Sequence, residues 1–226
     1  MDEPPSTPSI LRIRASGHRM RVLVLDDGRE FLFSDDACEH AGVHPGDAAT
    51  EDVFARLDAA EQRVNAHEAA LRLLGSRARS EKEMRTRLAM RGIEPAAIEE
   101  EVERLRRAGL LDDDKFARAW VEDRKRTAPR GRRMLRYELL GRGIEPESVD
   151  VVTNDVDDLA TATELARGKA RGAALGSYDT FVEKVGNFLR RRGFDYAVAS
   201  EAVRTAWQEA GGESLAEAPG SASEFP

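Results

Sequence analysis

The chain has 226 residues, of which 41% are hydrophobic, 6% aromatic and 34% charged, and its formal net charge is −7. This length allows one large domain or several small ones, each with an adequate core. The single cysteine excludes a disulfide framework and is typical of a reducing compartment. No run approaches the roughly 18 uninterrupted apolar residues that a membrane span needs, and the start of the chain lacks a secretory signal, so we expect a cytoplasmic protein.

The charge is distributed unevenly along the chain. Residues 72–150 contain 20 basic and 16 acidic residues, which gives this segment a net charge of +4, whereas the remainder of the chain carries −11. An acidic chain with a basic middle indicates a localised surface that faces anions, and not a general coat for nucleic acid.

The first part of the chain predicts a small β element. Residues 1–9 contain three prolines and no apolar pattern, which is typical of a disordered tail. Three short runs of strand-forming residues follow, and Asp27-Gly28 between two of them is a strong hairpin signal. We expect an antiparallel sheet of two or three strands within residues 10–49, followed by a short helix that ends near Gly42.

From residue 50 the apolar spacing changes to alternating steps of four and three. The residues at this spacing are Val53, Leu57, Ala60, Val64, His67, Leu71 and Leu74. They form one stripe on a long helix that stops near Gly75. Alanine and histidine are weak residues for a coiled-coil seam, although the stripe leaves dimerisation open. We expect the helix to pack on the sheet at one end and on the following helices at the other.

An internal repeat follows. Residues 91–95, RGIEP, recur at 142–146, and a weaker copy, RGFDY, occupies 192–196. A period of about 50 residues indicates three tandem units, and each unit reads as three helices. The glycine of the string ends the second helix, and in the first two units the proline begins the third.

The expected fold is therefore mainly α. Three tandem three-helix repeats form a curved, elongated array, preceded by the small N-terminal antiparallel β element and the long helix. The segments that we expect are a disordered tail at 1–9, the β element with its short helix at 10–49, the long helix with the first repeat at 50–111, the second repeat at 112–156, the third repeat at 157–210, and a disordered acidic tail at 211–226. A capping box, Ser80 with Glu83, begins the second helix of the first repeat.

Two stretches carry a family resemblance: ALRLLGSRARSEKEMRTRLAMRGIEPAAIEEEVERLRRAGLLDDDKFARAWVEDRKR and RGRRMLRYELLGRGIEPESV. Around them, roughly residues 69–207 resemble the RecX family, bacterial regulators of the RecA recombinase. The resemblance implies a protein without catalytic activity that binds the filament formed by RecA on single-stranded DNA. Such proteins lodge in the helical groove of the filament and inhibit its growth, ATP hydrolysis and strand exchange. The resemblance places the chain in recombination, DNA repair and the SOS response.

Two groups of basic residues are candidate contacts with RecA or with DNA in the filament. The middle basic cluster comprises Arg124, Lys125, Arg126, Arg130, Arg132, Arg133 and Arg136, and the third-repeat basic run comprises Arg190, Arg191 and Arg192. The cluster predicts a patch for phosphates or an acidic protein surface, with Gly131 allowing close approach of the backbone. Its alternative is a solvated helix face with a basic turn. The alternative for the run is a set of cations that offsets a helix dipole. Only Tyr137 lies among these arginines as an aromatic residue, so base stacking is not indicated.

The leading hypothesis is thus a non-enzymatic regulator that binds RecA filaments, with Arg130, Arg132, Arg133 and Arg136 as first-choice contacts. The alternative is a helical protein that binds DNA directly without RecA, in which case binding to bare DNA falls steeply with salt. We expect no cofactor, no membrane contact and no small-molecule substrate.

A third hypothesis is a metallo- or thiol enzyme built on a cysteine and histidine cluster. The cluster comprises Cys38, His40, His44 and His67, whose irregular spacing does not match a zinc site. Residues 112–114, three aspartates, do not continue at calcium-loop spacings, so we expect them to cap the helix that they precede. We therefore expect no metal site.

Overall fold

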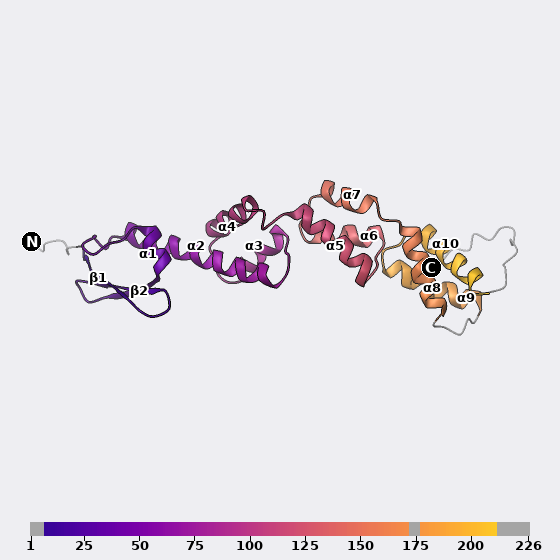
Figure 1. Cartoon of the computed structure of the whole chain (residues 1–226), viewed down its shortest axis with the longest axis horizontal. Helices are drawn as coiled ribbons and strands as arrows, with labels where there is room; N and C mark the ends of the chain where they lie inside the picture. Colours follow the sequence, from indigo (N-terminus) through magenta and orange to yellow (C-terminus); the bar gives the residue numbers. More distant parts are fainter. Residues whose placement is uncertain (1–6, 172–176, 212–226) are drawn as a thin grey trace, which may run out of the picture. The chain divides into compact units, whose positions relative to one another are not determined.

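The computed structural model describes residues 7–171 and 177–211 (Figure 1). The chain divides into two compact units, Met1–Asp113 and Asp114–Pro226. The described residues form a three-stranded sheet and ten helices. Most of the two tails predicted from the sequence, 1–6 and 212–226, lies outside the described residues. In the rest of the first tail, the carbonyl of Pro8 accepts a hydrogen bond from the Ala49 amide, and Ser9 pairs with Ala48.

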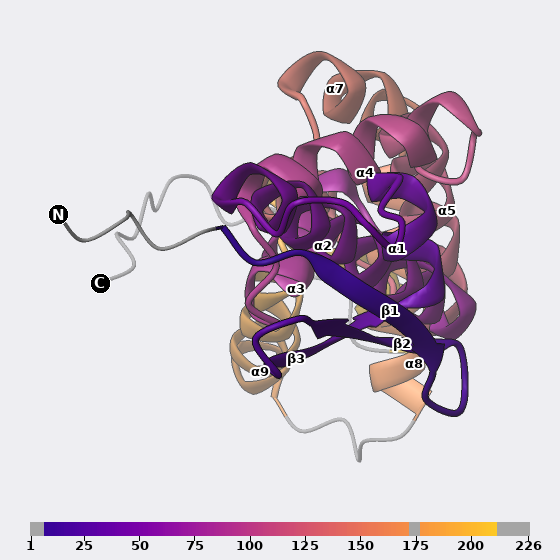
Figure 2. The ribbon, with the colours of Figure 1, turned by 90° about the vertical axis from the view of Figure 1, so that its left-hand side faces the viewer.

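The sheet of the first unit is antiparallel, as predicted. Its strands β1 (Ile10–Ala15), β2 (Met20–Leu25) and β3 (Glu30–Ser34) lie in the order β1-β2-β3. Successive side chains of a strand point to opposite faces, so Leu23 and Leu25 lie on one face, and both are buried. Helix α1 (Asp35–Ala41) begins after Ser34 and ends at Gly42, whose φ is 62°. Figure 2 shows the strands beside α1 and α2.

Helix α2 (Glu51–Ser76) belongs to two cores. Its first half contributes Val53, Leu57 and Ala60 to the core beneath the sheet, together with residues of α1. Its second half contributes Ala66 and Leu73 to a separate core with α3 (Glu81–Ala89) and α4 (Pro95–Arg107). The long helix therefore packs on the sheet at one end and on the first repeat at the other, as expected. The predicted stripe is wrong in the second half, where Leu71 is 44% exposed and Ala66 and Leu73 are buried instead.

The second unit contains two further three-helix groups, which confirms the tandem repeats. The first group has α5 (Asp113–Thr127), α6 (Arg132–Gly141) and α7 (Pro146–Asn154). The second group has α8 (Asp158–Arg171), α9 (Tyr178–Arg191) and α10 (Tyr196–Glu209). Each group has its own buried core. The curvature expected for the array stays a prediction.

A partly buried aspartate caps the second helix of each of the first two repeats. The Glu81 amide at the start of α3 donates to Asp113 Oδ1 at 2.9 Å, and the Arg132 amide at the start of α6 donates to Asp158 Oδ1 at 2.8 Å. The sequence predicts that the aspartates at 112–114 cap the helix that they precede. In the structure the Asp113 carboxylate instead caps the start of α3, because the chain returns there after α4. Burial raises the pKa of both carboxyl groups, against the opposing effect of these amide hydrogen bonds.

Replacement of Asp158 by asparagine tests this cap. Because the folded-state pKa of Asp158 is raised, the stability linked to its titration is present below the unfolded value, about 3.9, and is lost as the pH rises through the folded value. The amide of Asp158→Asn still accepts the hydrogen bond but does not ionise. We therefore expect the stability of the variant relative to the wild type to rise between about pH 4 and about pH 7 in urea unfolding. If the stability difference between Asp158→Asn and the wild type stays constant or falls over this pH range, ionisation of a partly buried Asp158 does not destabilise the fold. Asp158→Ala, which removes the cap, should cost about 1 kcal/mol near neutral pH.

Candidate functional site

The two basic groups predicted from the sequence meet inside the second unit. The Gly131 amide donates to the Arg192 carbonyl at 2.9 Å, and Arg192 Nη1 donates to the Pro129 carbonyl at 2.9 Å. We call this contact, formed by residues 129–134 and 190–194, the α6–α9 junction. The sequence leaves open whether the basic residues of the second and third repeats lie near each other. These hydrogen bonds show that the two segments are in contact.

Two glycines make this approach possible. A Cβ atom on Gly131 would lie 2.5 Å from the Gly193 carbonyl oxygen, and one on Gly193 would lie 2.4 Å from Met134 Cβ. The φ of Gly193 is also 90°, in the region that favours glycine. The sequence predicts that Gly131, which has no side chain, lets a bound ligand approach the backbone. In the structure the backbone of the third repeat occupies that position instead.

Glu138 of α6 neutralises part of the middle basic cluster. Its Oε2 atom lies 2.9 Å from Arg124 Nε, and its Oε1 atom lies 3.4 Å from Arg130 Nε. Trp120 Nε1 donates to the same carboxylate at 2.8 Å. The Trp120 ring in turn lies within 4.0 Å of the guanidinium carbon of Arg124 and 3.6 Å of that of Arg142. Trp120 packs partly buried against the core of the second repeat while it orders these arginines.

Three other predicted residues also have partners within the unit. Arg132 Nη2 donates to the carbonyls of Asn154 and Val156, both at 3.1 Å. Arg136 forms an ion pair with Asp150. Arg192 stacks over a phenylalanine ring, and burial, followed by the neighbouring charge of Arg130, lowers its guanidinium pKa. These side chains hold helices together.

Three arginines at the junction face outward. Arg133, Arg190 and Arg191 are exposed, and none has an ion-pair partner among residues 7–171 and 177–211. We call them the outward cations. Of the four first-choice residues, only Arg133 belongs to this set, because Arg130, Arg132 and Arg136 are engaged internally. In the α5 part of the cluster, Lys125 pairs with Glu122 at 2.7 Å, and Arg126 is 81% exposed with only a 3.4 Å contact to an aspartate.

Tyr137, which the sequence does not single out as a site residue, lies beside Arg133 on α6. Its side chain is 75% exposed on α6 and follows Arg133 by four positions, so the two residues are neighbours on one helix face. The four-residue spacing is the signal that could have found it. Tyr137 therefore adds an exposed aromatic ring beside Arg133, one of the outward cations.

Replacement of Glu138 by glutamine should destabilise the second unit. The variant leaves Arg124 and Arg130 without their shared anion, so we expect a loss of about 1–3 kcal/mol in thermal or urea unfolding. Glu122→Gln is the matched control, because it removes an exposed ion pair with Lys125 and should cost less than about 0.5 kcal/mol. Equal losses in the two variants would contradict a central role for Glu138.

The cysteine and histidine cluster has a structural explanation. No group of three or more metal-ligating side chains is positioned to hold an ion in the part of the chain that the structure describes. Cys38 is 2% exposed, and burial raises the pKa of its thiol, which disfavours the reactive thiolate. His67 Nδ1 lies 2.9 Å from the buried carboxylate of Glu101, so it links α2 to α4. In the described segments no helix is both long and apolar enough to cross a membrane.

The fold defines a class: a mainly helical protein of tandem three-helix repeats with a small N-terminal sheet. Family models identify its repeats. The model for "RecX, first three-helix domain" matches residues 66–105, and the model for "RecX, second three-helix domain" matches residues 112–152. The chain belongs to the RecX family.

Curated relatives and solved structures agree with this assignment. "Regulatory protein RecX" of Chlorobium phaeobacteroides (strain BS1) is 40% identical over 131 residues, which cover 58% of this chain and 85% of the relative. The protein of the same name from Mycolicibacterium vanbaalenii is 33% identical over 142 residues, 59% of this chain and 77% of the relative. A crystal structure of regulatory protein RecX has a TM-score of 0.65 at 21% identity and covers 86% of this chain and 98% of its own. RecX from Lactobacillus salivarius has a TM-score of 0.57 at 23% identity, covering 67% and 98%.

Proposed function

We propose that this protein is a non-enzymatic regulator that binds RecA filaments on single-stranded DNA, in their helical groove, and inhibits filament growth and ATP hydrolysis. The observation that carries the proposal is the α6–α9 junction, which collects the outward cations of two repeats on one unit. Membership of a family whose curated members are named regulatory proteins supports a regulatory role.

The charges of the junction suit a polyanionic partner. Arginine binds phosphates and carboxylates with two parallel hydrogen bonds, so Arg133, Arg190 and Arg191 suit DNA phosphates as well as acidic side chains. The neighbouring arginines Arg124 and Arg132 are held by Glu138 and by a backbone carbonyl, which leaves Arg133, Arg190 and Arg191 as the cations available to a partner. The net charge of −7 opposes indiscriminate attraction to nucleic acid and favours a partner that contacts the cationic face specifically.

The direct test is the rate of ATP hydrolysis by RecA filaments preassembled on single-stranded DNA and titrated with this protein. We expect inhibition at amounts of the protein far below those of RecA, together with weak binding to the same DNA without RecA. An unchanged ATPase rate when the protein is equimolar with RecA contradicts the proposal.

A second candidate, direct DNA binding without RecA, is favoured by Tyr137. Its exposed ring beside Arg133 could stack on an unpaired base, as aromatic residues do in single-strand binding proteins. This function predicts tight binding to bare DNA, with a logarithmic salt slope of about −0.7 per phosphate contacted. It also predicts that RecA is inhibited only when the protein saturates the DNA.

A further inference from the structure

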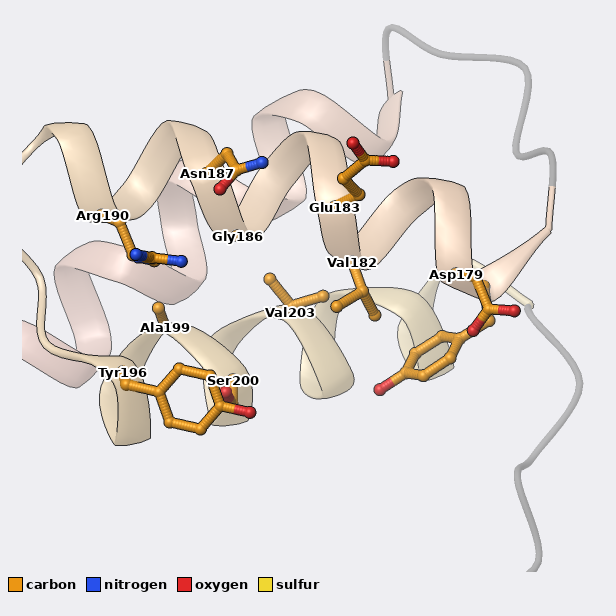
Figure 3. Close-up of a pocket in the computed structure, with 11 residues that line it drawn as sticks. Asp179, Val182, Glu183, Gly186, Asn187, Arg190, Tyr196, Ala199, Ser200 and Val203 are labelled. Carbon is orange, nitrogen blue, oxygen red and sulfur yellow. The ribbon is translucent and has the colours of Figure 1, made fainter. Parts of the chain in front are cut away.

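A groove lies between α9 and α10 of the third repeat. Its volume is about 670 Å³. Figure 3 shows Val182 and Val203 along its middle, Asp179 at one end, and Tyr196 with Arg190 at the other. We call this site the α9–α10 groove. Because Arg190 is also an outward cation, the groove continues from the α6–α9 junction.

In the first two repeats an ion pair bridges the equivalent helices. Arg85 of α3 pairs with Glu99 of α4 at 2.9 Å, and Arg136 of α6 pairs with Asp150 of α7. The repeat periods of 51 and 50 residues, read from the RGIEP strings, align both arginines with Gly186 and both acids with Ser200. Gly186 and Ser200 line the α9–α10 groove. The third repeat therefore has an open space where the other two have a bridging arginine.

The backbone does not require glycine at this position. Gly186 lies within α9, and a Cβ atom added to it would meet nothing within 4 Å. Glycine inside a helix costs about 1 kcal/mol relative to alanine. Glycine at position 186 therefore lowers the stability of α9 slightly, and close packing does not explain its presence there.

The rim of the groove has the chemistry to receive a cation. Asp179 and Glu183 are exposed carboxylates of α9, and neither has an ion-pair partner within the described part of the chain. Glu183 precedes Gly186 by three positions, and in α3 Glu81 precedes its partner Arg85 by four; both spacings place the two residues next to each other on a helix. Arg190 would repel a guest cation from the opposite end. The carboxylates thus place the positive group at the Asp179 end.

We propose that the α9–α10 groove binds an arginine side chain carried by an apolar segment of a partner protein. The arginine enters between Gly186 and Ser200 and takes the place of the bridging arginine of the other repeats. Its guanidinium pairs with Glu183 and Asp179, and the apolar neighbours of the arginine cover Val182 and Val203. This inference does not depend on RecA being the partner at the junction.

The test is an NMR titration of the full chain, labelled with ¹⁵N, with the peptide acetyl-Leu-Arg-Leu-amide. The comparison peptide contains citrulline, which has nearly the shape of arginine but no charge. We expect saturable shifts centred on the amides of Gly186 and Ser200, with the arginine peptide binding at least about fivefold more tightly. Equal affinity of the two peptides, or shifts centred elsewhere, would overturn the proposal.

Two sets of variants sharpen the result. Gly186→Arg with Ser200→Asp rebuilds the internal bridge, so this double variant should melt at or above the wild-type temperature and lose the peptide shifts. Gly186→Ala keeps the groove open and should bind as the wild type does. Asp179→Asn with Glu183→Gln changes only exposed side chains and should remove the preference for arginine over citrulline. Retained binding by the bridged variant, or a preference that survives in the neutral variant, rejects the assignment.

Sedimentation velocity at two protein concentrations distinguishes a partner protein from a second copy of this chain. We expect the wild type and the bridged variant to sediment as the same species. If the wild type dimerises and the bridged variant does not, the groove is a self-association site and the proposal of a partner arginine fails.

Discussion

Conversion of Arg133, Arg190 and Arg191 to glutamate is expected to weaken binding to RecA filaments on single-stranded DNA by about 100-fold. Each reversal replaces an attraction with a repulsion, and all three side chains belong to one junction. Because the residues are exposed and have no ion-pair partner among the described residues, the melting temperature should stay nearly constant. Fluorescence anisotropy of labelled filaments at fixed ionic strength measures the loss.

A matched control separates the location of the charge from its amount. Arg56, Arg118 and Arg204 are also exposed arginines without an ion-pair partner in the described segments, and they lie outside the α6–α9 junction. Their conversion to glutamate changes the net charge by the same amount but should weaken binding by less than about tenfold. Similar losses in the two triple variants would mean that net charge, and not the junction, governs binding.

Gly193→Ala is expected to have the largest effect on stability. The new Cβ atom would overlap Met134, and the residue would have to keep a φ of 90°. Steric overlap and left-handed strain together should cost about 3 kcal/mol or more. For a unit of this size, that loss lowers the melting temperature by more than about 12 °C. Filament binding should fall as well, since the overlap separates the two segments that carry the outward cations.

Gly92→Ala provides the comparison. Gly92 occupies the same position in the first repeat, with a φ of 77°, but a Cβ atom there would meet nothing within 4 Å. Only the left-handed strain remains, so the variant should lose about 1 kcal/mol and bind filaments normally. Differential scanning calorimetry of both variants checks the contrast. Equal losses at the two glycines would show that the close packing at Gly193 does not matter.

Local signals in the sequence were sufficient for most of the fold. Ser80 accepts a hydrogen bond from the Glu83 amide at the start of α3, as the capping box predicts. Gly92, Gly143 and Gly193 have positive φ after the second helix of each repeat. Helix ends and repeat lengths depend on residues a few positions apart, which a single sequence displays directly.

The candidate site was predictable only in part, because its geometry depends on distant residues. The sequence identified both basic groups, but the opposition of Gly131 and Gly193 joins positions in different repeats. Glu138 could be recognised as the one acid among many arginines, yet not as the partner of Arg124 and Arg130. Similarly, Asp113 is the first residue of α5 but caps α3, because the chain folds back after α4.

The α9–α10 groove shows another limit of the sequence pattern. The repeat period aligns Gly186 with Arg85 and Arg136. The consequence of having glycine in place of arginine depends on what those two arginines bind. Only the structure shows that both arginines bridge to the third helix of their repeat. The absence of this ion pair from the third repeat can therefore be recognised only after the pairs of the first two repeats are known.

Site-specific photocrosslinking most directly tests whether the α6–α9 junction contacts the filament. A benzophenone amino acid replaces Tyr137, which is 75% exposed beside Arg133, and the control carries the same group at Arg56. On filaments assembled from RecA and single-stranded DNA, we expect crosslinks to RecA or to the DNA from position 137 and little from position 56. Efficient crosslinking from position 56 with none from position 137 would contradict this expectation.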